Sequence, residues 1–469
     1  MIVYLKSTNR STFANGNCFI CEVTNYKAVL MGHMQLFCSS RIYNEEWLFL
    51  DVIALLLFVL IVALAFFKKM NAGVLALAVA VIAVRIFNLS DSDILAGVSA
   101  SMFCTLVGLT LLFGVINSTG ALDLLAHKIV ALAGKRVWLL PIAIYIAGFI
   151  VSAVGPGAIP ALAIIPALGV SVALKVGYSP VMLTLIGYCG MTGGRMSPLT
   201  PEAALIGSVC EEAGLTNGIP IVWLCAIIAS FASAFSMYFL FKGYKLKEAK
   251  SVISLQELPK FTSKQIISLC SIVVLLIMLV VFDVNIALAA FVVAVVLILM
   301  GISEEDAVLK KLPWGTIIMV LGVGAFLGIV DAVGGIQLLS DMLASIMSSA
   351  TATPIMGITA GLMSMVSSAL GVVYPTLMPV CVEVAAQVGG VNPLSLIAAV
   401  AAGASLSGFT TLSTGGALMV ATMSTADPSF TKEEENKLFV RLFGVAAISI
   451  IAMAIAAALF FNPIVSLLY

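Results

Sequence analysis

Charged residues are scarce in this chain. Asp, Glu, Lys and Arg make up 10% of the 469 residues and cancel to a net charge of zero, whereas a soluble domain carries about 25%. Only two histidines are present, so neither a histidine-rich metal site nor the basic excess of a nucleic-acid-binding protein is indicated. Hydrophobic residues make up 62% of the sequence, and the mean hydropathy is +1.18. This composition excludes a soluble domain and predicts a protein embedded in the lipid bilayer.

Apolar runs of bilayer length recur along the chain. About 20 apolar residues are needed to cross the hydrocarbon core of a membrane as a helix. The runs of this kind lie at 47–67, 72–88, 98–118, 218–241, 264–282, 285–301, 313–333 and 437–461. Two further regions, 136–209 and 353–424, are too long for one or two plain helices and are rich in Gly, Pro, Ser and Thr. The sequence therefore predicts an all-α polytopic membrane protein.

Lysine and arginine are unevenly distributed among the predicted loops. If the loop that holds Lys68 and Lys69 faces the cytoplasm, alternation of the spans puts 17 of the 19 basic residues after Trp47 on that side. The exceptions are Arg85 and Arg195. Because short loops rich in Lys and Arg stay cytoplasmic, we predict a multi-pass protein of the cell membrane with both termini outside.

A constant offset in numbering aligns the two Gly- and Pro-rich regions without a gap. It pairs Pro141 with Pro354 (354 − 141 = 213), Gly148 with Gly361, Pro166 with Pro379, Gly177 with Gly390, Pro180 with Pro393 and Gly190 with Gly403. An odd number of spans per copy inverts the second copy relative to the membrane. We predict two inverted repeats, each with five transmembrane helices, one re-entrant hairpin and a broken helix, an architecture typical of secondary transporters.

The predicted domain boundaries follow from this alignment. They are 1–46 for an N-terminal extension, 47–241 for the first repeat, 242–262 for a basic cytoplasmic linker and 263–469 for the second repeat. The extension lacks the pattern of a signal peptide, and we interpret it as a flexible segment or a non-native upstream start. Its Cys18, Cys21, His33 and Cys38 suggest zinc only weakly, because the spacing of the second pair is loose; we predict no metal site.

Each copy contains a stretch that suits the tip of a re-entrant hairpin. These stretches are 151–157 and 365–371, each with an apolar arm on either side. The next helix of each copy breaks, at 192–201 and at 405–414. A break creates helix N-termini that attract anions, and its free carbonyls and hydroxyls suit sodium. For each single hydroxyl, the alternative is helix packing or a hydrogen bond to the preceding turn.

Arg195 and Glu202 are two charges at predicted membrane depth. A charge there costs several kcal/mol and is usually functional. The second copy has Gly408 and Gly415 at the matched positions. Either Arg195 holds a substrate carboxylate while Glu202 serves as a charge partner or proton carrier, or the two side chains form an ion pair that neutralises both.

The chain after Trp47 resembles the ion transporter superfamily. This superfamily includes divalent anion:sodium symporters, citrate and gluconate permeases, and arsenite or sodium/proton antiporters. The sequence Gly-Gly-Arg-Met-Ser-Pro-Leu-Thr-Pro at 193–201 is similar to a stretch of MatC-like dicarboxylate carriers. The resemblance implies that carboxylate and sodium bind between hairpin tips and helix breaks, that transport is an elevator-like movement, and that the protein is a homodimer.

The predicted site residues lie at the tips and in the breaks. For the substrate they are Gly155, Pro156, Gly157, Gly194, Arg195, Ser197, Thr200, Ser367, Ser368, Thr410, Thr411, Ser413 and Thr414. For the coupling cation they are Ser152, Gly193, Ser197, Ser367, Ser407 and Thr411. Glu202 is the predicted proton or charge partner, and no cofactor is expected besides the coupling ion.

The leading interpretation is a secondary active transporter for a small dicarboxylate-type anion, coupled to a sodium or proton gradient. A sodium/proton or inorganic-anion antiporter of the same superfamily is the alternative, with Glu202 as its titratable acid. A membrane-embedded enzyme is disfavoured, because His33 and His127 lie at the periphery and no nucleophile stands near a base at membrane depth.

Overall fold

The computed structural model describes residues 45–134, 136–246, 255–410, 413–426 and 430–469. The chain divides into two compact units, Met1–Leu50 and Asp51–Tyr469, and the account below concerns the second. The predicted extension, with its four weak zinc candidates, lies outside the described residues except for its last two.

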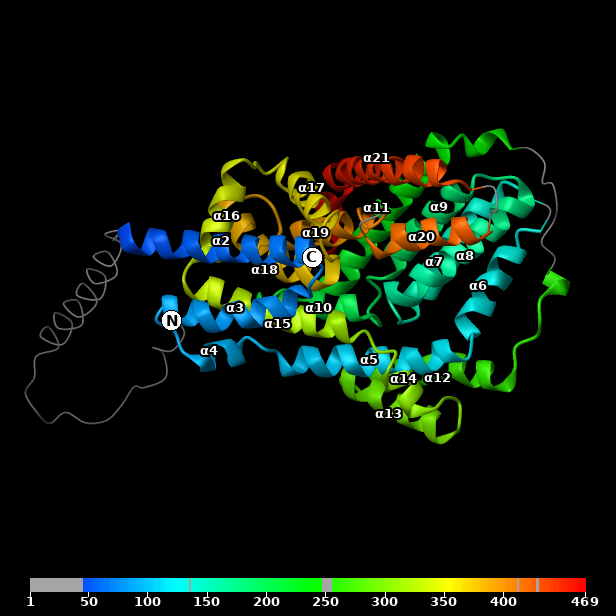
Figure 1. Cartoon of the computed structure of the whole chain (residues 1–469), viewed down its shortest axis with the longest axis horizontal. Helices are drawn as coiled ribbons and strands as arrows, with labels where there is room; N and C mark the ends of the chain where they lie inside the picture. The colour runs from blue at the N-terminus through cyan, green and yellow to red at the C-terminus, as the bar shows by residue number, and fades with distance from the viewer. Residues whose placement is uncertain (1–44, 135, 247–254, 411–412, 427–429) are drawn as a thin grey trace, which may run out of the picture. The chain divides into compact units, whose positions relative to one another are not determined.

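Every regular element in the described part of the chain is a helix (Figure 1). The first half contains α2 (Glu45–Lys68), α3 (Ala72–Ile86), α4 (Asp91–Ala96), α5 (Ala100–Ser118), α6 (Ala121–Ala131), α7 (Leu139–Ala153), α8 (Ala158–Val176), α9 (Pro180–Gly194), α10 (Pro201–Glu212) and α11 (Gly218–Leu240). The second half contains α12 (Ser263–Val280), α13 (Ile286–Leu299), α14 (Glu305–Leu309), α15 (Trp314–Ala332), α16 (Gly335–Ser345), α17 (Ala352–Ser364), α18 (Tyr374–Val388), α19 (Pro393–Leu406), α20 (Thr414–Ala426), α21 (Lys432–Ala456) and α22 (Asn462–Leu468). Short helical turns are η2 (Gly243–Lys245), η3 (Leu255–Glu257), η4 (Ala369–Val373) and η5 (Ala457–Phe461).

Eight helical segments within the described ranges are long and apolar enough to cross a membrane. They are Leu50–Lys68, Asp91–Ser118, Ala158–Val176, Gly218–Leu240, Ser263–Val280, Trp314–Ala332, Ala369–Val388 and Lys432–Leu468. The five shorter apolar helices are α3, α7, α13, α17 and α19. The prediction of an all-α polytopic membrane protein is confirmed.

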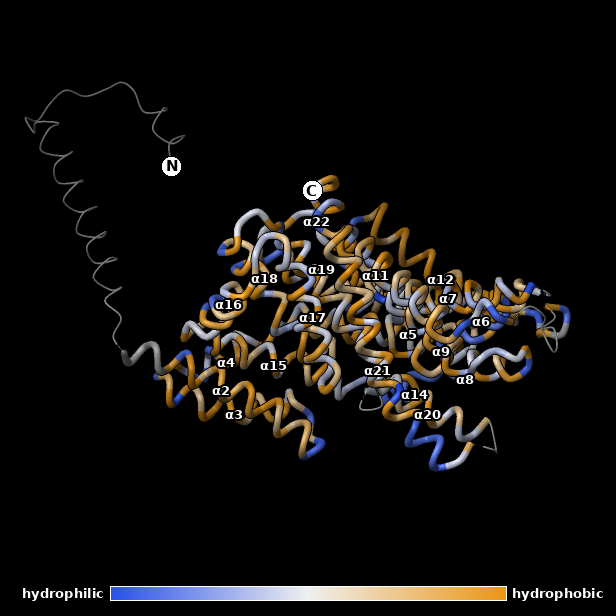
Figure 2. Tube along the Cα trace, turned by 90° about the horizontal axis from the view of Figure 1, so that it is seen from above, coloured by the Kyte–Doolittle hydropathy of each residue, from blue (hydrophilic) through white to orange (hydrophobic). Residues whose placement is uncertain are grey.

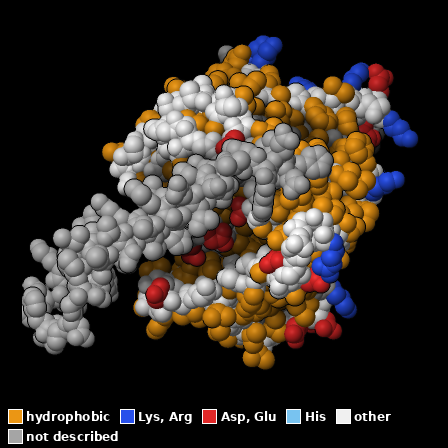
Figure 3. Space-filling view, turned by 90° about the vertical axis from the view of Figure 1, so that its left-hand side faces the viewer, with side chains coloured by type: hydrophobic (Ala, Val, Ile, Leu, Met, Phe, Trp, Pro, Cys, Tyr) orange, Lys and Arg blue, Asp and Glu red, His pale blue; other side chains and the backbone are white. Residues whose placement is uncertain are grey.

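Large apolar side chains stay exposed along these helices. Val280 and Leu299 are 80% and 81% exposed, and Figure 3 shows hydrophobic side chains over much of the surface beside a hollow that holds acidic ones. Hydrophilic positions gather in the connecting segments (Figure 2). Soluble monomers rarely expose contiguous apolar surface on this scale, so the exposed faces suit contact with lipid.

The helix starts recur at the spacing found in the sequence. α9 begins at Pro180 after the cap Ser179, and α19 begins at Pro393 after the cap Asn392 (393 − 180 = 213). A proline at the first helical position and a polar cap before it both favour helix initiation. The starts of α7 and α17, at 139 and 352, differ by the same offset, as do those of α10 and α20, at 201 and 414.

Helices from the two halves pack at backbone contact. A Cβ atom on Gly322 of α15 would clash with the carbonyl oxygen of Gly73 on α3. The matching pair brings Gly108 of α5 against α13, with 2.7 Å from its built Cβ to the Ala287 carbonyl oxygen. Small residues allow such close approach, which is how helices associate within a membrane. The two halves therefore interlock through these four helices.

The two arms of each hairpin differ in length. α7 has 15 residues, but the arm after the tip, α8, has 19 and continues through an internal Pro166. In the second half α17 has 13 residues, and η4 and α18 together form the 20-residue segment Ala369–Val388. Only the first arm of each pair is short. Proline is tolerated inside these helices because neighbouring groups can satisfy the freed carbonyls.

Candidate functional site

The first helix break lies between Gly194, where α9 ends, and Pro201, where α10 begins. The Thr200 hydroxyl donates toward the carbonyl oxygens of Arg195 (2.6 Å) and Ser197 (2.8 Å) and accepts from the Ala203 amide (3.2 Å). Thr200 is thus the N-cap of α10 and closes the loop before it. The Ser197 hydroxyl donates to the Ala153 carbonyl (2.7 Å) and ties the break to the first hairpin.

The second break shows the same arrangement 213 residues further along the chain (413 − 200 = 213). The Ser413 hydroxyl bonds to the carbonyls of Gly408 and Thr410 and accepts from the Gly416 amide (3.4 Å). The Thr410 hydroxyl donates to the carbonyl of Met365 at the second hairpin (3.1 Å). Both breaks are therefore closed and fastened to their own hairpin by a matching pair of hydroxyls.

The two hairpin tips differ in chemistry. In the first tip the Ser152 hydroxyl donates to the carbonyl of Gly157 (2.8 Å), whose φ of +63° suits glycine. In the second tip the Ser367 hydroxyl donates to the Met363 carbonyl (2.7 Å), and the Ser368 oxygen accepts from the Gly371 amide (3.1 Å). The Ser368 hydroxyl has no acceptor for its own proton among the described residues, so it can donate that proton to a ligand.

Arg195 and Glu202 face each other across the first break. The Arg195 Nη2 and Nε atoms lie 3.0 and 3.1 Å from Glu202 Oε1, and the two residues are 8% and 3% exposed. The amide of Ala158, at the start of α8, donates to the same oxygen (3.3 Å). Glu202 Oε2 is buried and has no hydrogen-bond partner within the described ranges of the chain. Of the two alternatives for Arg195 and Glu202, the structure therefore shows the ion pair.

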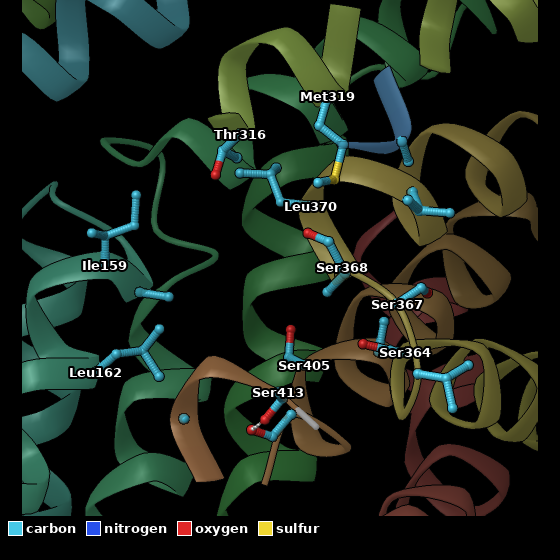
Figure 4. Close-up of a pocket in the computed structure, with 18 of the residues that line it drawn as sticks. Ile159, Leu162, Thr316, Met319, Ser364, Ser367, Ser368, Leu370, Ser405 and Ser413 are labelled. Atoms are coloured by element: carbon cyan, nitrogen blue, oxygen red, sulfur yellow. Dashed lines mark hydrogen bonds between the residues drawn. The ribbon is translucent and has the colours of Figure 1, made fainter. Parts of the chain in front are cut away.

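A cavity of about 640 Å³ lies where the two breaks meet. Arg195, Glu202 and their glycine counterparts Gly408 and Gly415 all line it, and Arg195 and Glu202 are its charged lining residues. Figure 4 shows its serine residues on one side and Ile159 and Leu162 of α8 on the other. The cavity thus offers a ligand the Arg195 guanidinium, which is already paired with the Glu202 carboxylate, together with a wall of serine hydroxyls and an apolar wall.

The predicted site residues separate into three groups. Those that line the cavity are Arg195, Glu202, Ser367, Ser368 and Ser413. Those that lie at the breaks and tips without lining it are Ser152, Gly155, Pro156, Gly157, Gly193, Gly194, Ser197, Thr200, Ser407 and Thr410. Thr411 lies outside the described residues, and the side chain of Thr414 is also not described.

The residues outside the cavity have identifiable structural contacts. The Gly193 carbonyl accepts from Trp223 Nε1 (2.9 Å), and the Ser407 hydroxyl donates to the Ala404 carbonyl (3.0 Å). Pro156 lines a much smaller space beside α5 and α15. Their predicted roles in binding stay predictions.

Several cavity residues had not been predicted. Thr316 and Met319 come from α15, Ser364 from the end of α17, and Ser405 from α19. The Ser405 hydroxyl is held by the hydroxyl of the buried Tyr374 (2.5 Å). Ser405 stands inside the predicted break at 405–414, so that pattern could have found it, whereas Thr316 and Met319 sit in an ordinary apolar span.

The fold and the site define a multi-pass membrane transporter for a small anion. The features that define it are eight long apolar helices, paired helix breaks and a cavity with a buried guanidinium. The chain belongs to the citrate transporter family, whose model matches residues 58–403. It is accordingly a carboxylate-family transporter and not an enzyme, and the resemblance to the ion transporter superfamily is confirmed.

The fold is also found among solved structures. The crystal structure of the YdaH transporter from Alcanivorax borkumensis, described as having an unusual topology, matches with a TM-score of 0.54 and 14% sequence identity. The match covers 88% of this chain and 98% of that one. At this identity the likeness concerns the fold alone. No curated protein matches the chain significantly.

Proposed function

We propose that this protein is a secondary active transporter that carries citrate or a similar small carboxylate across the cell membrane, driven by a sodium or proton gradient. The observation that carries this proposal is the cavity between the two breaks, where Arg195 is the cation among the lining residues. The guanidinium is suited to carboxylates because it offers several donors in one plane.

Binding works by exchange of carboxylates at Arg195. Glu202 Oε1 now occupies the place of a substrate carboxylate, since it accepts from the guanidinium and from the amide at the start of α8. A substrate carboxylate that enters the cavity competes for the same donors. The Ser368 hydroxyl, which already accepts from an amide, is free to donate to a second carboxylate of the substrate.

Alternating access would come from two inverted repeats. The constant offset between matched helix starts supports this arrangement, as does the matching capping of the breaks by Thr200 and Ser413. The interlocked helices α3, α5, α13 and α15 form the proposed scaffold. The element that moves against this scaffold in an elevator-like step consists of the two hairpins, including their arms α8 and α18, and of the helices beside the breaks, α9, α10, α19 and α20.

The coupling cation, the dimer and the orientation complete the proposal. Hydroxyls and carbonyls at the tips and breaks suit sodium, and Glu202, with one oxygen unpaired and buried, suits a proton. The homodimer is implied by the superfamily resemblance. The uneven distribution of lysine and arginine supports outside termini.

The test is transport by the purified full chain in proteoliposomes. Labelled mono-, di- and tricarboxylates are offered under a sodium gradient alone, a pH gradient alone and neither. We expect accumulation of citrate or a related carboxylate that requires one gradient. Equal uptake without any gradient refutes active coupling, and failure to move any carboxylate refutes the substrate class.

A further inference from the structure

A second hollow lies on the outer face of the first half, away from the cavity. It has a volume of about 360 Å³. Its lining is almost wholly apolar and aromatic: Trp138, Pro141, Ile142, Tyr145, Ile186, Phe231, Ala234, Phe235, Tyr238 and Phe239. These residues come from the first turns of α7, the middle of α9 and the second half of α11. The transport proposal assigns it no role.

The hollow opens toward lipid. Trp138 and Phe231 on its rim are 60% and 61% exposed, on helices that are apolar along their length. Its floor carries one polar contact, the bond between the Tyr145 and Ser230 hydroxyls (2.7 Å). Because the Tyr145 and Ser230 hydroxyls are hydrogen-bonded to each other, neither is left unpaired against an apolar occupant.

One end of the hollow is basic. α7 begins at the same end of the hollow at which α11 ends, since both lie against the start of α9. Tyr178, just before α9, donates to the Val137 carbonyl (3.2 Å), and Gly243 packs against Tyr238 and against Met182 of α9. Arg136 precedes α7 and Lys242 follows α11, and both are exposed. Neither side chain has an ion-pair partner among the described residues.

We propose that this hollow is a binding site for one anionic phospholipid, with an acyl chain between α7 and α11 and the phosphate between Arg136 and Lys242. The aromatic lining supplies the close packing that distinguishes one site from the bulk bilayer. Basic residues at the end of a membrane helix attract anionic headgroups. Trp138 and Tyr238 are amphipathic rings of the kind that sit at the level of the headgroups.

The experiment uses the purified full chain, reconstituted in equal amounts of phosphatidylglycerol and phosphatidylcholine and then transferred to detergent. Native mass spectrometry counts the lipids that each chain retains. We expect wild-type protein to retain one phosphatidylglycerol with at least about fivefold preference over phosphatidylcholine, the size that one basic residue near a headgroup supplies. A preference near one overturns the proposal, since the hollow then holds ordinary boundary lipid.

Variants separate the two parts of the site. Arg136→Gln with Lys242→Gln should lower the headgroup preference to near one, whereas the control Lys310→Gln with Lys311→Gln, a basic pair beyond α14, should leave it unchanged. Ala234→Phe fills the hollow and should abolish retention of either lipid. Ile142→Trp fills the hollow from its rim and replaces Ala234→Phe if that variant does not fold. Wild-type retention in a folded filling variant refutes the site.

Discussion

The buried pair of Arg195 and Glu202 gives the sharpest test, because its structural and functional roles predict different outcomes. Arg195→Met removes the cation from beside the Glu202 carboxylate, which is 3% exposed and keeps one other hydrogen bond among the described residues, from the Ala158 amide at 3.3 Å. An unpaired buried charge of this kind costs about 3–5 kcal/mol. The single variant should therefore melt well below wild type in detergent.

The double variant Arg195→Met with Glu202→Gln separates the two roles. It removes both charges, so most of the lost stability should return. Transport should not return, because the guanidinium is the proposed partner of the substrate carboxylate. A charge-assisted hydrogen bond contributes about 1.5–3 kcal/mol, which corresponds to a KM raised about 10- to 150-fold.

The assays are thermal unfolding of purified protein and concentration-dependent uptake into proteoliposomes. If the double variant transports with wild-type kinetics, the pair is structural only and the site has been misassigned. If the double variant is no more stable than Arg195→Met, the loss does not come from an unpaired carboxylate. A lone Glu202→Gln variant completes the cycle and should bind substrate more tightly, since the competing carboxylate is gone.

Three further predictions concern the surroundings of the pair. Gly157→Ala places a Cβ atom against Glu202 Oε2 at a φ of +63°, and should lower the free energy of unfolding by about 1–3 kcal/mol and slow uptake. The control Gly214→Ala has a similar φ, but its Cβ atom has nothing within 4 Å. Equal losses in both variants would show that the contact with Glu202 is irrelevant. Ser368→Ala should raise the KM for the carboxylate about 2- to 12-fold at unchanged expression, and an unaltered KM would remove this hydroxyl from the site. Tyr374→Phe breaks the bond to Ser405 and should lower unfolding stability by about 0.5–1.5 kcal/mol; Ser405→Ala on that background should add little, and full additivity would contradict a shared bond.

The helix breaks were predictable from the sequence, and the cavity was predictable only in part. Proline at 180, 201 and 393 and the glycines before the breaks indicate where helices start and stop. A hydroxyl in a break, however, looks the same in the sequence whether it caps a helix or faces a ligand. The structure shows Thr200 capping α10, while Ser368 faces the cavity.

The pairing of Arg195 with Glu202 also needed the fold. The two lie on either side of the first break, and the sequence could not say whether that break brings them together. Thr316 and Met319 of α15 were missed for a different reason. They belong to an apolar span whose composition resembles that of any lipid-facing helix, and only its packing against the second hairpin turns them toward the cavity.

The comparison of the two breaks indicates which residues maintain the fold and which select the ligand. The capping hydroxyls occur in both breaks, at Thr200 and Ser413, and each closes its own loop in the same way. The charges occur in the first break alone, since Gly408 and Gly415 stand at the matched positions of the second. All four of these positions line one cavity, so the charge on its lining comes from the first break. Matched helix breaks with one cation between them suit an asymmetric occupant: in the proposed binding mode one carboxylate of the substrate lies at Arg195, and the rest of the substrate lies against the serine hydroxyls.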